Sequence, residues 1–198
     1  MELLEDKKKV LRQHFLSLRK QMSGSERLLK DTAVEDRIVD LECFAGAVGI
    51  VGYESDGYEV EIRRVMEKAV RAGKMAALPR YSRAKKCYEP VMVSNFEQDL
   101  IEARYGLLEP RPELPVAQVD QQWLWLIPAV AFDKYGTRLG RGGGFYDRML
   151  SEYPGRRIGV FYQCQFSCEV LPQAEHDQKL ELAVTEIKVY NFNSHSNC

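Results

Sequence analysis

The sequence predicts an α/β fold with an open, mostly parallel sheet, because short apolar runs alternate with helical periodicity along most of the chain. The apolar runs are rich in β-branched and aromatic residues and have the length of buried strands. Between them, apolar residues recur at the three- and four-residue steps of a helix face. This alternation is typical of a Rossmann-like three-layer sandwich, in which helices cover both faces of the sheet.

The first forty residues predict two helices. Four apolar residues share one face of the first helix: Leu11, Phe15, Leu18 and Met22. The sequence Ser23-Gly-Ser-Glu26 then has the form of a capping box, so we expect a second helix to begin there and to run toward Asp40.

The rest of the chain continues the alternation. We expect strands at residues 47–53, 74–79, 123–132, 157–162 and 182–190, and helices at 59–71 and 145–153. Residues 80–115 fit this rhythm less well, and they predict either an antiparallel excursion or a long active-site loop. We expect residues 1–190 to form a single catalytic domain and the polar residues 191–198 to form a disordered tail.

Composition and charge exclude several function classes. The 198 residues include 28 Lys and Arg against 29 Asp and Glu, so no net field draws the chain to nucleic acid or membrane. Residues 1–20 are charged throughout and contain no apolar core of a signal peptide. We therefore expect a cytoplasmic protein with small-molecule partners and no nucleic-acid or membrane partner, and we expect a monomer.

The cysteines do not predict a disulfide framework. There are five of them, and most lie far apart: Cys43, Cys87, Cys164, Cys168 and Cys198. The pair Cys164 and Cys168 could form half of a metal site, but no second Cys/His pair has ligand spacing. Structural or incidental thiols are the favoured interpretation.

The chemistry concentrates in residues 138–147, Arg-Leu-Gly-Arg-Gly-Gly-Gly-Phe-Tyr-Asp, which we call the glycine loop. Four glycines in five positions let the backbone approach a ligand closely and adopt positive φ. The loop leads into a predicted helix, so free N–H groups and the positive end of the helix dipole converge on one point. Arg138 and Arg141 add bidentate phosphate donors. Asp147, one turn into the helix, could hold Mg²⁺ on bound phosphates.

The glycine loop carries more specific chemistry than a flexible turn. A turn does not need two arginines, two aromatic residues and an aspartate in fixed order. The loop is also neither a Walker A sequence nor a dinucleotide fingerprint. The residues themselves therefore predict a nucleotide site with a metal.

The glycine loop closely resembles the signature of the 5-formyltetrahydrofolate cyclo-ligase family. Four weaker matches lie in that family's order along the chain: Lys8–Arg12, Tyr53–Glu61, Tyr105–Pro110 and Glu175–Lys179. The resemblance implies an ATP- and Mg²⁺-dependent enzyme that acts on a reduced folate. Without this resemblance, a solvated helix face would be the favoured interpretation of Lys8 and Arg12, ahead of a phosphate clamp.

The resemblance also implies a role for each matched residue. Catalytic residues would be Arg141, Tyr146 and Asp147. ATP would be bound by Lys8, Arg12, Arg138, Leu139, Gly140, Arg141, Gly142, Gly143, Gly144, Phe145 and Tyr146. The folate would be bound by Asp56, Glu59, Glu61, Tyr105, Arg141, Gly142, Gly143, Gly144 and Phe145. The metal would be held by Asp147 and Asp177.

Two alternative functions remain open at this point. A small-molecule kinase would use the same phosphate loop but would need no aromatic pterin pocket near Tyr105. A non-catalytic sensor could bind a phosphorylated metabolite on the same fold, but it would need no pair of metal-binding acids such as Asp147 and Asp177.

Overall fold

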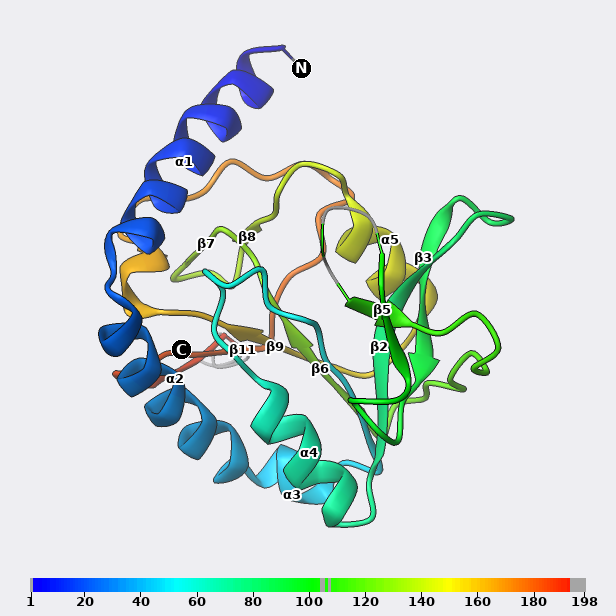
Figure 1. Cartoon of the computed structure of the whole chain (residues 1–198). Coiled ribbons are helices and arrows are strands. Elements are labelled where there is room, and N and C mark those ends of the chain that lie inside the picture. The colour runs from blue at the N-terminus through cyan, green and yellow to red at the C-terminus, as the bar shows by residue number, and fades with distance from the viewer. Residues whose placement is uncertain (1, 104–105, 107, 193–198) are drawn as a thin grey trace, which may run out of the picture.

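A seven-stranded sheet forms the centre of the computed structural model, which describes residues 2–103, 106 and 108–192 (Figure 1). Its strands are β1 (Gly49–Val51), β2 (Met75–Ser82), β3 (Cys87–Met92), β6 (Trp123–Ile127), β9 (Arg156–Val160), β11 (Leu182–Val184) and β12 (Val189–Asn191). The spatial order is β12-β11-β9-β6-β1-β2-β3. The five inner strands are parallel, and the two edge strands β3 and β12 pair antiparallel with their neighbours. The predicted fold class is therefore confirmed.

Three helices cover one face of the sheet. They are α2 (Gly24–Val39), α3 (Glu42–Gly46) and α4 (Arg63–Arg71). The predicted cap of α2 is confirmed, because the Ser23 side chain accepts a hydrogen bond of 3.2 Å from the Glu26 backbone N–H. From α2, Val34 and Ile38 are fully buried and belong to the same apolar cluster as Ile50 of β1.

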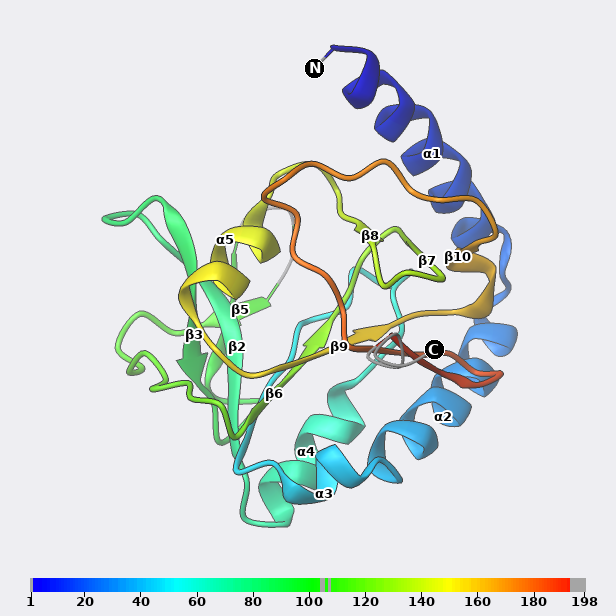
Figure 2. The same cartoon turned by 180° about the vertical axis from the view of Figure 1, so that it is seen from behind.

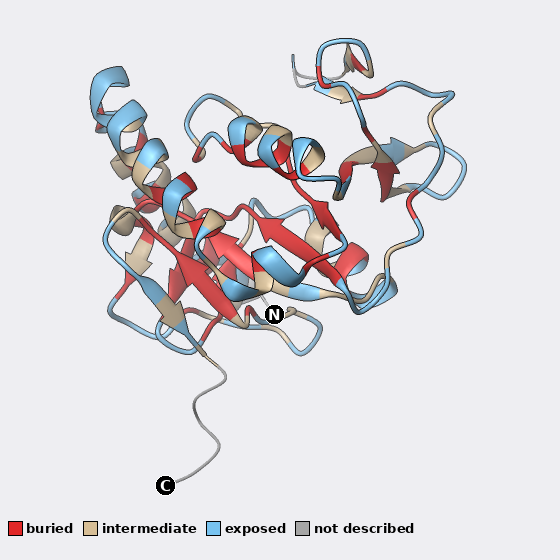
Figure 3. Ribbon diagram, turned by 90° about the horizontal axis from the view of Figure 1, so that it is seen from below, coloured by how far each residue is buried: buried red, intermediate tan, exposed pale blue. Residues whose placement is uncertain are grey.

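The opposite face carries α5 (Phe145–Glu152) and a small sheet made of β7 (Ala131–Asp133), β8 (Arg138–Leu139) and β10 (Phe166–Ser167). Met149 and Leu150 of α5 are buried in the same cluster as Trp125 of β6. The rings of Phe132 and Phe161 stack in this cluster with centroids 4.4 Å apart. Helices thus lie on both faces, and the strands between them are the most buried part of the molecule (Figure 3).

The first helix, α1 (Glu2–Gln21), lies along the flank of the molecule (Figures 1 and 2). Its buried Phe15 packs with Val130, Leu139 and Leu171, which come from the region around β7 and β8 and from the segment after β10. Apolar packing therefore places α1 beside the start of the glycine loop. No helix in the described part of the chain is long and apolar enough to cross a membrane.

Three predicted elements differ most from the structure, and the other predicted strand and helix boundaries shift by at most three residues. The strand predicted at 123–132 ends at Ile127, and the chain then enters the small sheet as β7; Pro128, which has no backbone N–H, stands at the break. The strand predicted at 182–190 is two antiparallel strands, β11 and β12, joined by a turn in which Thr185 Oγ1 accepts from the backbone N–H groups at 187 and 188. The helix predicted at 59–71 begins only at Arg63.

Residues 80–115 form the antiparallel excursion that was one of the two expectations. Strand β2 extends to Ser82 and turns back as β3, and a separate hairpin pairs β4 (Leu100–Glu102) with β5 (Leu108–Pro110). This region extends the sheet on the side away from α1 (Figure 1).

Candidate functional site

The candidate site lies where the chain leaves the carboxyl end of β1. The loop from β1 to α4 carries Asp56 and Glu59, and the glycine loop reaches it through Arg141. In open α/β sheets, ligands bind in crevices outside the carboxyl ends of the strands. The glycine loop itself follows β8 of the small sheet, not a strand of the central sheet.

The glycine loop has the backbone that its sequence predicts. Gly142 and Gly144 have positive φ values of 100° and 63°, which only glycine adopts without strain. Gly144 is also the N-terminal cap of α5. The backbone N–H groups of Gly142 and Gly143 donate no hydrogen bond to any described residue. They are therefore available to an anion at the start of α5.

Helix α1 brings two cations to this loop. Arg12 donates from Nε to the carbonyl oxygen of Gly140 at 2.9 Å. Its guanidinium lies so close to Gly142 that an added Cβ there would be 3.3 Å from Arg12 Cζ. Lys8, one turn earlier, is buried and contacts Asp177 Oδ2 at 2.7 Å. The two side chains are therefore covered by other parts of the chain, and the solvated-face interpretation is wrong.

Two carboxylates lie around the buried Arg138. Both guanidinium Nη atoms of Arg138 donate to Asp147 Oδ1, at 2.9 and 2.8 Å. The backbone N–H of Gln178 donates to the same oxygen at 3.0 Å, which joins the segment after β10 to the start of α5 (Figure 2). Burial lowers the pKa of Arg138, while Asp147 and Asp177 oppose that shift. The structure thus brings Lys8, Arg138, Asp147 and Asp177 together.

These carboxylates are suited to share a Mg²⁺ ion with phosphate. Among the described residues, Oδ2 of Asp147 and Oδ1 of Asp177 accept no hydrogen bond, and the polar contact of Asp177 Oδ1 is with His176 Nε2 at 3.8 Å. No group of three or more His, Cys, Asp or Glu side chains that could hold a metal occurs among the described residues. Mg²⁺ typically takes one or two carboxylates and completes its shell with phosphate oxygens and water. The donor set therefore fits Mg²⁺ bound together with a phosphorylated ligand.

The surroundings of Asp177 stabilise its ionised form. Burial would raise its pKa, but the Ala174 backbone N–H and the Lys8 ammonium group outweigh burial and lower it.

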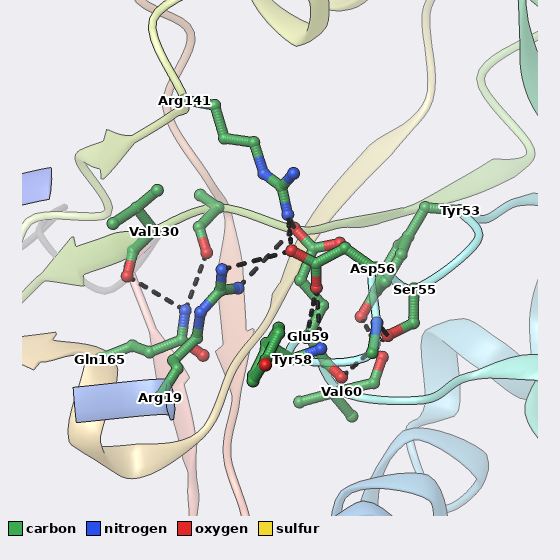
Figure 4. A network of polar contacts seen from close by, with 12 residues as sticks. Arg19, Tyr53, Ser55, Asp56, Tyr58, Glu59, Val60, Val130, Arg141 and Gln165 are labelled. Atoms are coloured by element: carbon green, nitrogen blue, oxygen red, sulfur yellow. Dashed lines mark hydrogen bonds and ion pairs between the residues drawn. The ribbon is translucent and has the colours of Figure 1, made fainter. Parts of the chain in front are cut away.

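A second cluster links the glycine loop to the loop after β1 (Figure 4). Arg141 Nη2 donates to Asp56 Oδ2 and, at 2.9 Å, to Glu59 Oε1. Burial raises the pKa of Glu59, whereas hydrogen bonds from the backbone N–H groups of Tyr58 and Glu59 and the nearby cations together lower that of Asp56, against its own burial. At this pair, a proton would therefore bind Glu59 first.

Arg19 also belongs to this cluster, although the sequence did not single it out. Its side chain is 1% exposed and approaches Asp56 and Glu59 to 3.7 Å in each case (Figure 4). It lies on the same face of α1 as Lys8, Arg12 and Phe15, at steps of four, three and four residues. That spacing was the available signal: the buried face of α1 is basic as well as apolar.

The remaining predicted residues are placed differently. Glu61 is exposed, and its Oε1 accepts from the Arg63 backbone N–H at the start of α4, so the structure does not bring it to the cluster. Phe145 is 43% exposed and meets the ring of Tyr88 edge-on, with centroids 4.9 Å apart. Burial strongly raises the pKa of Tyr146, which therefore stays a neutral phenol. Tyr105 lies outside the described residues. Cys164 is half-buried and Cys168 exposed, and both are free thiols.

The fold and the site define an α/β enzyme in which a glycine-rich loop reaches, through Arg141, the carboxyl end of β1 in the central sheet. The chain belongs to the 5-formyltetrahydrofolate cyclo-ligase family, whose family model matches residues 4–186. It is 34% identical over 148 residues to the 5-formyltetrahydrofolate cyclo-ligase of Escherichia coli (strain K12), covering 68% of this chain and 75% of the relative.

Two further relatives extend this comparison. A 5,10-methenyltetrahydrofolate synthetase structure from Aquifex aeolicus superposes with a TM-score of 0.81 at 27% identity and covers 96% of this chain and 95% of that chain. An Arabidopsis thaliana relative, named as mitochondrial, is 26% identical over 205 residues and covers 92% of this chain and 72% of its own length. The family resemblance and the ligase class are confirmed. The roles of single residues and the cytoplasmic location stay predictions.

Proposed function

We propose that this chain catalyses the ATP-dependent cyclisation of 5-formyltetrahydrofolate to 5,10-methenyltetrahydrofolate, with release of ADP and phosphate. The observation that carries the proposal is the meeting of three segments: Lys8 contacts Asp177, and Asp177 and Asp147 both act on Arg138. Helix α1 brings Lys8, the glycine loop brings Asp147, and the segment after β10 brings Asp177. A binder of an uncharged ligand would need neither the cations nor the paired acids.

The chemical problem explains why ATP is needed. A formamide is a poor electrophile, and its oxygen is a poor leaving group. Transfer of the γ-phosphoryl group of ATP to the formyl oxygen solves both difficulties, because the oxygen can then leave as phosphate. The neighbouring amine nitrogen of the reduced folate attacks the formyl carbon, the carbon–oxygen bond breaks, and the nitrogen loses its proton as the five-membered ring closes.

Phosphoryl transfer requires mainly positioning and neutralisation of charge. Lys8, Arg12, Arg138 and the free amides of the glycine loop would hold the phosphates. Mg²⁺ held by Asp147 and Asp177 would neutralise charge on the phosphate oxygens. No nucleophilic side chain is required.

The folate would lie on the side of the glycine loop that faces Asp56 and Glu59, opposite the side that holds the phosphates. Asp56 and Glu59 offer carboxylate acceptors for the N–H groups of the pterin ring, and Arg141 lies between this pair and the phosphate side. Phe145 and Tyr88 supply aromatic surface next to it. In the neutral form enforced by burial, Tyr146 can donate a hydrogen bond to the formyl or phosphate oxygen.

An oxygen-18 experiment tests the mechanism. Substrate labelled in the formyl oxygen should deliver one labelled atom per turnover to inorganic phosphate, with ADP as the co-product, as measured by mass spectrometry. Label released into water would contradict phosphorylation of the formyl oxygen. A stable phosphorylated substrate without free phosphate would instead identify a kinase.

A further inference from the structure

The most unusual side chain of the site is Arg19 of α1, which is almost completely buried and weakly partnered. Its Nε and Nη1 atoms have no hydrogen-bond partner among the described residues. Its nearest charges are Asp56 Oδ2 and Glu59 Oε1, both at 3.7 Å, which is too long for a hydrogen bond. Burial of a charge is expensive unless something compensates it. The fold therefore holds a cation beside two carboxylates without using it to make a tight ion pair.

Two arginines share these carboxylates, and they differ in exposure and in contact. Arg141 comes from the glycine loop, its side chain is 48% exposed, and it makes the direct hydrogen bonds. Arg19 reaches the same pair from a different direction and is enclosed by the protein (Figure 4). Only Arg141 can leave the pair by rotation of its side chain.

We propose that Arg19 is a positioning residue: it stays beside Asp56 and Glu59 and keeps both charged and oriented when Arg141 turns to the phosphates. The proposal rests on the proposed function, which needs Arg141 at the reacting groups and both carboxylates at the pterin ring. Without Arg19, departure of Arg141 would leave two neighbouring buried carboxylates with no cation. One of them would then take up a proton and stop accepting a pterin N–H.

The groups that face Glu59 support the inference that its carboxylate would take up a proton if both arginines were missing. Asp56 lies on its own loop, Arg141 on the glycine loop and Arg19 on α1, and the phenols of Tyr53 and Tyr146 also lie near it. Burial strongly raises the pKa of both phenols, so neither supplies a charge. The hydroxyl of Tyr162 donates to the backbone carbonyl oxygen of Glu59 at 3.3 Å. Arg141 and Arg19 are the cations among these groups, and Arg19 is the one that stays beside Glu59 when Arg141 turns to the phosphates.

A direct test measures the carboxylate without any ligand. Arg141→Gln imitates the state in which Arg141 has left, and NMR of carbon-13-labelled glutamate follows the titration of Glu59. Adding Arg19→Met to Arg141→Gln should raise the pKa of Glu59 by about one unit or more, the size expected for loss of a nearby opposite charge. Adding Arg19→Lys should restore most of the difference, and Lys20→Met, on the exposed neighbour, should change nothing. If Glu59 titrates in the same way in Arg141→Gln with and without Arg19→Met, the proposal is overturned.

Folate binding provides the second readout. In Arg19→Met alone, 5-formyltetrahydrofolate should bind more weakly at low pH, and the loss should approach about tenfold once the pH lies below the pKa of Glu59 in both proteins, because one pKa unit corresponds to a factor of ten. The defect should shrink as pH rises and the carboxylates ionise, while ATP affinity stays the same. A loss that is equal at every pH, together with a lowered unfolding midpoint, would mean a merely structural role and would overturn the proposal.

Glu59→Gln separates this proposal from the proposed function. If that variant binds the folate as well as the unmodified chain does, the assignment of the pterin to Glu59 fails. The NMR titration would still show whether Arg19 controls the charge of the pair.

Discussion

Asp147 is the residue on which the proposed phosphate site would depend most. Its Oδ1 accepts from both Nη atoms of Arg138 and from the backbone N–H of Gln178, and its Oδ2 accepts from none of the residues that the structure describes. We expect Asp147→Asn to lower turnover by roughly 10²–10³, the loss typical for one electrostatic contact to a reacting group. Turnover measured against Mg²⁺ concentration checks this.

Glu152→Gln is the matched control, because Glu152 lies on the same helix but is exposed. It should keep normal turnover. Near-normal turnover of Asp147→Asn at saturating Mg²⁺ would remove Asp147 from the metal site.

Substitution of Gly142 tests whether ATP binding needs the backbone conformation of the glycine loop. At φ 100° an alanine is strained, and its Cβ would also press on the Arg12 guanidinium. We expect Gly142→Ala to weaken ATP binding by about tenfold, since a strain of about 1.4 kcal/mol is a factor of ten. Gly46→Ala is the control, because Gly46 lies outside the site at the end of α3, its φ is ordinary and nothing lies within 4 Å of the added Cβ. Equal effects of both substitutions on a binding isotherm would argue against a specific loop geometry.

At the scale of the element, we propose that α1 binds ATP as well as packing against the domain. Lys8→Ala or Arg12→Ala should weaken ATP by about 10- to 100-fold, because a hydrogen bond to a charged group contributes about 1.5–3 kcal/mol. Folate affinity should change much less, since both side chains lie on the phosphate side. Calorimetric titration with each ligand distinguishes the two effects.

Lys9→Ala is the control for α1, because Lys9 is exposed on the same turn. Equal weakening of ATP and folate by Lys8→Ala would indicate a general loss of structure. Unchanged ATP affinity would leave Lys8 with a purely structural ion pair to Asp177.

Elements with a local signal could be predicted, and those determined by distant contacts could not. Ser23 marks the start of α2 because its side chain caps the helix locally. The break after Ile127 could be read only in part from Pro128, because the small sheet that takes up β7 is completed by β10, far along the chain. Arg19 was missed for the same reason: its role depends on Asp56 and Glu59, which the sequence alone does not place beside α1.

At the scale of the whole molecule, stability should depend on the inner strands of the sheet. Leu126 of β6 is fully buried, and Leu126→Ala should cost about 2–5 kcal/mol in the free energy of unfolding, the usual range for such a cavity. Leu28 of α2 is 64% exposed, so Leu28→Ala should stay within about 0.5 kcal/mol. Urea unfolding of both variants measures the contrast. Similar losses for the two would mean that β6 does not lie in the core.

The contact between Lys8 and Asp177 has a consequence for the order of events during folding. These residues are 169 positions apart, yet their side chains meet at 2.7 Å. Contacts between such distant parts of a chain form slowly, because the long segment between them must be ordered first. A ribosome that has made α1 must add nearly all the remaining residues before the partner of Lys8 exists. Until then the helix carries its cations without their carboxylate. ATP binding at the proposed site would therefore report that the segment after β10 has already reached α1.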